Sequence, residues 1–223
     1  MSLTFYFHPL SSFCQKALIA LYENDTPFTP HKVDLQDEAQ SVAFKKIWPV
    51  RKFPVLRDGD RIIPESTSII EYLAQHYPGP VKLVPADAEA ALDVRAQDRF
   101  FDLSIHIPMQ KIIGDRLRAP GQTDAYGVEH ARTALQTALA IADKHMAKRG
   151  WAAGETFSMA DCAAAPTLFY IDMVVAPLAG SYDNVAAYLG RLKKRPSFAR
   201  ALEEAKPFLQ YVPRDRTAAP AAI

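Results

Sequence analysis

Val50–Leu73 reads VRKFPVLRDGDRIIPESTSIIEYL and combines a proline, a hairpin and the start of a helix. Val55-Leu56 and Arg61–Ile63 predict two short strands around Asp58-Gly59, a dipeptide that readily takes the positive φ angles of a tight turn. Proline donates no ladder hydrogen bond, so Pro54 belongs at the entry of the first strand, where the preceding peptide bond can be cis. The hairpin therefore begins at a proline-marked strand entry.

The helix start follows directly. Ile69, Ile70 and Leu73 have helical spacing after the polar pair Glu65-Ser66. Backbone amides of a first helical turn and a serine hydroxyl can hold a carboxylate, and a glutamate can hold a neighbouring ammonium. The strand-entry backbone beside them can pair with an extended peptide. The stretch therefore predicts a binding site for a small zwitterionic peptide.

Composition restricts the class of protein. The chain has 223 residues, with 26 basic and 25 acidic residues and a net charge of +1. This balance gives no electrostatic reason to expect nucleic acid or a membrane surface as a partner. No apolar run approaches the roughly 20 residues that span a bilayer, and the N-terminus lacks a signal-peptide pattern, so we expect a cytoplasmic protein. Cys14 and Cys162 are too few and too distant in sequence to suggest a disulfide framework, and no residues group as metal ligands.

The first third of the chain alternates strands and helices. We expect strands at Leu3–Phe7 and Thr29–Leu35, a helix from Ser11 or Ser12 to about Asn24, and a helix at Ala39–Ile47. With the hairpin and its helix, the order is βαβαββα, an α/β domain at residues 1–78. The sequence YPGP at 77–80 and the proline at 85 interrupt any helix, which predicts a linker at 79–87.

The second part is predicted to be an all-α helical bundle at residues 88–223. Candidate helices cover 88–117, 125–148, 158–175, 182–194 and 196–205. Pro108 should bend the first of them. Ser158 and Asp161 form a capping-box pattern at the start of the third. The tail Thr217–Ile223 has no periodicity, and we expect it to be loosely held.

Chemistry is concentrated in the turn His8–Lys16, which reads HPLSSFCQK and joins the first strand to the first helix. In an open α/β sheet, this end of a strand faces the ligand. The spacing resembles the redox motif of glutaredoxins, with Ser11 in the place of the first cysteine and Cys14 in that of the second. A hydroxyl cannot replace the attacking thiol of dithiol exchange, but it can stabilise the thiolate of another molecule.

Together these motifs resemble the cytosolic glutathione transferases over nearly the whole chain. The resemblance is carried by the serine turn with Lys16, by Phe53–Leu56, by Glu65-Ser66 and by Ser158–Asp161. It is greatest with the serine-using zeta, theta and phi classes. It implies a thioredoxin-like N-terminal domain, an all-helical C-terminal domain, glutathione as co-substrate without a metal, a homodimer, and a role in detoxification.

The resemblance also implies roles for single residues. Ser11 would hydrogen-bond the glutathione sulfur, with Ser12 as the alternative. The Phe53 backbone beside cis-Pro54 would pair with the cysteinyl unit. The γ-glutamyl end would be held by Glu65 and Ser66, and the glycine carboxylate by Lys52. Trp48 and Arg51 depart from the family pattern near the glycine end, which bears on the role of Lys52.

The pocket for the second substrate is less marked in the sequence. Its candidate lining residues are His8, Leu10, Ile105, Met109 and Arg116. Ile105, Met109 and Arg116 recur at helical spacing together with Phe101 and Ile112, and the same pattern is typical of a buried stripe. Cys14, on the first turn of its helix, is either a reactive thiol or a small packed side chain.

Three functions remain open from the sequence. The first is conjugation of glutathione, activated as its thiolate, to a small hydrophobic electrophile. The second is a glutathione-dependent isomerase or dehalogenase that uses the same site. The third is a non-catalytic binding or regulatory protein with the same fold, against which the presence of Ser11, Glu65 and Ser66 argues.

Overall fold

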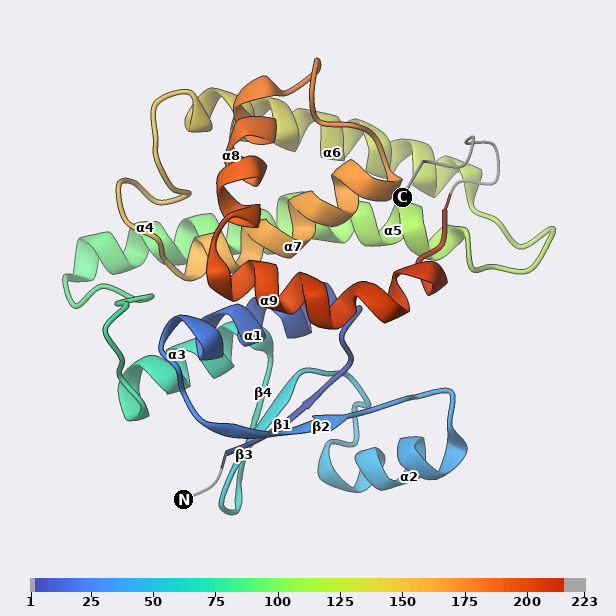
Figure 1. The fold of residues 1–223 in the computed structure, drawn as a ribbon. Helices are drawn as coiled ribbons and strands as arrows, with labels where there is room; N and C mark the ends of the chain where they lie inside the picture. Colours follow the sequence, from blue (N-terminus) through green and yellow to red (C-terminus); the bar gives the residue numbers. More distant parts are fainter. Residues whose placement is uncertain (1–2, 215–223) are drawn as a thin grey trace.

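The computed structural model describes residues 3–214, and the expectation for the tail Thr217–Ile223 lies outside this range. A mixed sheet forms the base of the molecule, and a bundle of helices lies above it (Figure 1). The strands are β1 (Leu3–Phe7), β2 (Phe28–Lys32), β3 (Val55–Asp58) and β4 (Arg61–Pro64), in the spatial order β2-β1-β3-β4. β1 is parallel to β2 and antiparallel to β3, and β3 and β4 form the predicted hairpin.

Helices cover both faces of this sheet. α1 (Ser12–Glu23) and α3 (Ser66–His76) lie between the sheet and the bundle, and α2 (Glu38–Ile47) covers the other face (Figure 1). The alternation along β1 explains this arrangement: Phe5 packs with the core of α1 and α3, whereas Tyr6 packs with Phe44 of α2. The fold is a thioredoxin-like N-terminal domain followed by an all-helical domain, as predicted.

β2 differs from its predicted range of 29–35. It begins at Phe28 and ends at Lys32, because its partner β1 has five residues and the ladder ends with them. The Val33 amide still donates to the Phe7 carbonyl, 2.9 Å away. After it, the Asp34 side chain accepts the Gln36 amide in a turn that leads the chain away from the sheet.

The helical domain contains α4 (Ala88–Arg99), the π-helical segment η1 (Phe100–His106), α5 (Ile107–Asp115), α6 (Ala125–Met146), α7 (Met159–Val174), α8 (Asp183–Lys193), α9 (Pro196–Ala205) and the 3₁₀ segment η2 (Lys206–Tyr211). α7 is buried along most of its length and packs on α1 of the first domain. At its start, Asp161 accepts the Ser158 amide at 2.8 Å, which confirms the capping box.

The predicted single helix 88–117 is in fact three segments. At the end of η1, the Ile107 amide donates to the carbonyl of Asp102, five residues back. Pro108 has no amide hydrogen, and its ring would clash with the carbonyl four residues back in a regular α-helix, so a wider turn precedes it. η1 carries four buried residues, of which Asp102 and His106 are polar and Phe101 and Ile105 are apolar.

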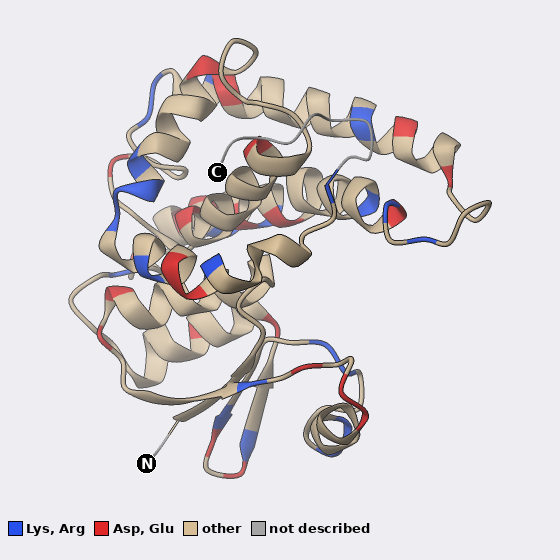
Figure 2. Cartoon of the chain, turned by 45° about the vertical axis from the view of Figure 1, so that its right-hand side comes forward, with Lys and Arg blue, Asp and Glu red and all other residues tan. Residues whose placement is uncertain are grey.

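Acidic and basic residues occur on both domains (Figure 2). Within residues 3–214, no helix is both long and apolar enough to cross a membrane, and no group of His, Cys, Asp and Glu side chains is placed to hold a metal ion.

Candidate active site

The β1–α1 turn places two serines at the start of a helix. Ser11 is the N-cap of α1, and its Oγ accepts the amide of Cys14 at 3.3 Å. Because the oxygen is the acceptor in this contact, the Ser11 proton remains available for another group. Ser11 is half-buried and Ser12 is buried.

Ser12 contacts the helical domain. Its Oγ lies 3.3 Å from Nε2 of His106, and Nδ1 of the same ring lies 3.1 Å from Oγ1 of Thr167 in α7. Burial, reinforced by the positive charge of Lys16, lowers the pKa of His106 to about 3. The imidazole is therefore neutral at physiological pH.

Residues 50–73 lie next to the serine turn and line the other side of the candidate site. The Phe53-Pro54 bond is cis, and the Phe53 ring lies 6.1 Å from that of His8. Ser66 is the buried first residue of α3, and Glu65 precedes it with a φ of 68°. Glu65 and Ser66 line a cavity of about 240 Å³ together with Phe13, Ser68, Asp102 and Arg99, among others. The predicted γ-glutamyl residues thus lie beside the serine turn, whereas Lys52 is exposed in the loop before β3.

Lys16 lies beneath this site and is fully buried. Its Nζ lies 2.7 Å from Asp102, 2.5 Å from Asp98 and 2.8 Å from Thr67 Oγ1 at the start of α3. An ammonium has three protons, and three acceptors surround it. Lys16 was part of the sequence motif, but Asp98 and Asp102 were not predicted to be its partners. The signal that could have found them is their spacing of four residues, which places both on one face of a helix.

A second cavity, of about 510 Å³, opens above the serines. Its described lining residues carry no charge: Leu10, Ser11, Ser12, Phe53, Met109, Gln110, Ile113, Gly114, Leu117, Tyr170, Tyr211, Val212 and Pro213. Its size and apolar character are typical of a small-molecule site. The sequence did not point to Tyr170, whose hydroxyl donates to the Leu10 carbonyl at 2.9 Å.

Of the five residues predicted for the second substrate, Leu10 and Met109 line this cavity. Ile105 is fully buried in the core instead, because η1 shifts the face that precedes α5. The Arg116 guanidinium donates to the carbonyls of Val174 and Pro213, at 2.7 and 3.0 Å. His8 lies between the rings of Phe53 and Phe208. None of these three side chains is among the described residues that line this cavity.

Cys14 is not a reactive thiol. It has no exposed surface, and burial raises its pKa to about 12, so the thiol stays protonated. Of the two alternatives, the packed side chain is correct.

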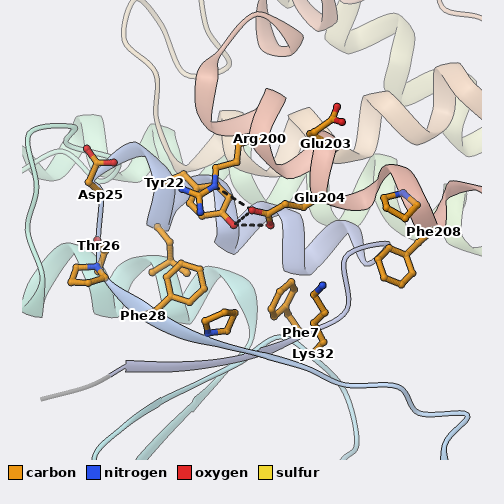
Figure 3. Close-up of a pocket in the computed structure, with 14 residues that line it drawn as sticks. Phe7, Tyr22, Asp25, Thr26, Phe28, Lys32, Arg200, Glu203, Glu204 and Phe208 are labelled. Carbon is orange, nitrogen blue, oxygen red and sulfur yellow. Dashed lines mark hydrogen bonds and ion pairs between the residues drawn. The ribbon is translucent and has the colours of Figure 1, made fainter.

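A larger cavity, of about 760 Å³, lies between β2 and α9 (Figure 3). The Tyr22 hydroxyl there donates to Glu204, and the Arg200 guanidinium lies 3.9 Å from the centre of the Tyr22 ring. None of the predicted site residues lines it. Size alone therefore does not identify the active site.

Comparison with known proteins agrees with this geometry. The family model for the N-terminal domain of glutathione S-transferase matches residues 5–81, and that for the C-terminal domain matches residues 125–191. The chain belongs to the glutathione S-transferase family. Bovine (Bos taurus) glutathione S-transferase theta-1 is 38% identical over 95 residues, covering 42% of this chain and 40% of that protein.

Other relatives match more of the chain. A maleylpyruvate isomerase from a Ralstonia species is 30% identical over 203 residues, covering 85% of this chain and 91% of that protein. The solved structure of a glutathione S-transferase from Methylobacillus flagellatus with glutathione bound superposes with a TM-score of 0.82 at 25% identity, covering 90% of this chain and 98% of that one. Members of this family thus include both transferases and an isomerase.

Proposed function

We propose that this protein is a glutathione transferase that conjugates the glutathione sulfur to an uncharged, apolar electrophile. One observation carries the proposal: the Ser11 hydroxyl, at the start of α1, faces an uncharged cavity of about 510 Å³. We also propose that residues 1–78 bind glutathione, that 79–87 are a linker, and that 88–223 supply most of the second pocket.

Glutathione would lie across the edge of the N-terminal domain. Ser66 and the first amides of α3 are suited to the γ-glutamyl carboxylate, and Glu65 is suited to its ammonium. The Phe53 backbone beside cis-Pro54 would pair with the extended peptide, and Phe53 also lines the second cavity. The related structure from Methylobacillus flagellatus has glutathione bound, which supports glutathione as the ligand.

Ser11 would supply the activation. A thiol with a pKa of about 8.5 is only a few per cent ionised at neutral pH. Lowering this pKa by roughly two units requires about 2.7 kcal/mol of preferential thiolate stabilisation. A hydrogen bond to an anion contributes about 1.5–3 kcal/mol, and a helix N-terminus adds about 0.3–1 kcal/mol. Ser11 at the N-cap of α1 has both.

The reaction is then a substitution at carbon. The thiol proton leaves to water, the thiolate attacks the electrophilic carbon of an aryl chloride, a C–S bond forms, and chloride departs with the electrons of the C–Cl bond. The protein holds both reactants next to each other, which lowers the entropic part of the barrier. No covalent intermediate with the enzyme is needed.

The second cavity favours conjugation over isomerisation of an organic acid. Maleylpyruvate is an anion, and a cavity that binds an anion commonly supplies a cation to it. Within residues 3–214, no Lys, Arg or His side chain lines this cavity, and Arg116 is turned to the carbonyls of Val174 and Pro213. The isomerase relative therefore indicates the family and not the substrate.

We further propose a homodimer. Leu92, Leu103 and Ile107 expose 58%, 53% and 51% of their surface along α4, η1 and α5. Apolar side chains in such a row are typical of an interface. Gel filtration with light scattering should give twice the monomer mass of 24.8 kDa.

The test of the transferase is direct. Calorimetry should detect binding of glutathione at millimolar concentration, and absorbance should report its conjugation to chlorodinitrobenzene. Ser11→Ala should lower kcat at least tenfold with a much smaller effect on the Kd for glutathione, because its bond forms mainly with the thiolate. Absence of binding heat at millimolar glutathione would overturn every glutathione-dependent function, and binding without conjugation of any uncharged electrophile would favour the regulatory alternative.

A further inference from the structure

Three buried side chains form a continuous hydrogen-bonded chain behind the serine turn. Ser12 in α1, His106 in η1 and Thr167 in α7 are 9%, 1% and 1% exposed. The contacts are Ser12 Oγ to His106 Nε2 at 3.3 Å and His106 Nδ1 to Thr167 Oγ1 at 3.1 Å. Thr167 Oγ1 also lies 2.9 Å from the carbonyl oxygen of Ala163.

The proton of Thr167 can be placed from this last contact. A carbonyl oxygen only accepts, so the single Thr167 proton must lie between Oγ1 and the Ala163 oxygen. Thr167 is then the acceptor from His106, and the ring carries its proton on Nδ1. The opposite arrangement would leave two oxygens 2.9 Å apart without a proton between them.

The proton of Ser12 follows from that of His106. The ring is neutral because burial and the charge of Lys16 both disfavour a second proton. The ring also packs against the Phe13 ring of α1, at 4.2 Å between ring centres. With its single proton on Nδ1, the ring has a lone pair on Nε2. Ser12 must donate its only proton to that lone pair.

From this geometry we infer that His106 and Thr167 are positioning residues that keep the Ser12 proton in the bond to His106. Towards the glutathione sulfur Ser12 can then only accept, so that Ser11 alone can donate to it. The inference rests on the proposed function. Both serines line the same cavity, yet they are not equivalent. Ser11 stabilises the thiolate, whereas the Ser12 oxygen presents lone pairs, which suit the neutral thiol and not the anion.

This inference predicts a rescue. In Ser11→Ala, the adjacent Ser12 hydroxyl cannot donate to the glutathione sulfur in place of Ser11, because it donates its only proton to His106. Adding Thr167→Val removes the acceptor for Nδ1 and keeps the side-chain volume nearly unchanged. The ring can then carry its proton on Nε2 and donate to Ser12, which frees the Ser12 proton for the sulfur. A second mutation should therefore restore part of what the first removed.

The measurement is the pKa of the bound glutathione thiol, from the ultraviolet absorbance of the thiolate as a function of pH. Ser11→Ala should raise this pKa by about one to two units, the equivalent of one hydrogen bond to an anion. Ser11→Ala/Thr167→Val should lower it again by about one unit and raise kcat/KM by up to tenfold over Ser11→Ala. A purely structural role for Thr167 predicts a further loss.

Thr137→Val is the matched control, because the Thr137 hydroxyl also donates to a backbone carbonyl, 3.0 Å away in α6, and does not line the cavity. In the Ser11→Ala background it should not change the pKa of the bound thiol.

His106→Leu also frees the Ser12 proton and tests the same rescue if the Thr167 variant does not fold. A folded double variant with a thiol pKa no lower than that of Ser11→Ala overturns the inference. A wild-type protein that forms no bound thiolate overturns the proposed function itself.

Discussion

Lys16 Nζ lies 2.7 Å from Asp102, one turn along α1 from the contact between Ser12 and His106. Ser12 and Lys16 are four residues apart, and so are Asp102 and His106, so the two pairs form successive polar contacts between α1 and η1. The earlier residue of α1, Ser12, contacts the later residue of η1, His106, and Lys16 contacts Asp102, so the two segments run in opposite directions where they meet. The N-terminal domain is thus fixed to the helical domain directly below the candidate site.

Lys16→Met should destabilise the protein strongly. It removes the buried cation between Asp98 and Asp102 and, within residues 3–214, leaves them only the half-exposed guanidinium of Arg99, 2.6 Å from Asp98. Removing one partner of a buried ion pair costs about 3–5 kcal/mol. Urea unfolding followed by circular dichroism measures this loss. Arg95→Met is the control, since its exposed pair with Glu71 contributes about 0–1 kcal/mol. Equal losses in the two variants would contradict the role of the buried cluster.

The fold could be predicted because its signals are local. The hairpin, the alternation in Leu3–Phe7 and the capping box at Ser158 are each specified within a few residues. The hairpin turn itself lies at Gly59-Asp60, one residue later than predicted, because Asp58 still pairs with Arg61. The end of β2 could not be predicted, because the length of β1 determines it. When the length of the neighbouring strand decides where a strand ends, the sequence of the strand itself does not show its end.

Only the part of the candidate site that the N-terminal domain contributes could be predicted from the sequence. Ser11, Phe53 and Ser66 follow from turns and helix starts. The partners from the helical domain, such as His106, are residues whose role depends on a contact with α1, distant in sequence. The burial of Ile105 in the core could not be predicted either, because the π-helical segment changes the periodicity on which a helical stripe depends.

The stability of the protein should fall in mild acid partly through His106. The unfolded imidazole titrates near 6.5 and the folded one near 3, so between these values only the unfolded chain carries the proton. Acidification through this range favours unfolding, by about 2 kcal/mol at pH 5. His106→Gln should remove that part of the difference between urea unfolding at pH 7.5 and at pH 5. His130→Gln, at an exposed position, should leave it unchanged, and an equal slope in all three proteins would contradict the assignment.

Ser66→Ala should weaken glutathione binding more than it slows turnover. Its hydroxyl would contact the γ-glutamyl end, which does not change during the reaction, so the loss is the same in ground and transition states. A hydrogen bond to a carboxylate corresponds to about 1.5–3 kcal/mol, or at least a tenfold rise in Kd by calorimetry. Ser181→Ala, at an exposed position far along the chain, is the control. A large fall in kcat with an unchanged Kd would instead place Ser66 at the reacting sulfur.

Gln110→Arg should shift the preference of the enzyme towards anionic electrophiles. Gln110 is exposed on α5 and lines a cavity whose described residues carry no charge, so a guanidinium there would face the second substrate. The ratio of kcat/KM for chloronitrobenzoate to that for chlorodinitrobenzene measures the effect. An ion pair open to solvent contributes about 0.2–1 kcal/mol, so the ratio should rise up to about fivefold. Gln136→Arg on the exposed face of α6 adds the same charge without lining the cavity and should leave the ratio unchanged. A wild-type enzyme that already prefers the benzoate would show that the cavity binds anions without a cation, and would contradict the uncharged substrate class.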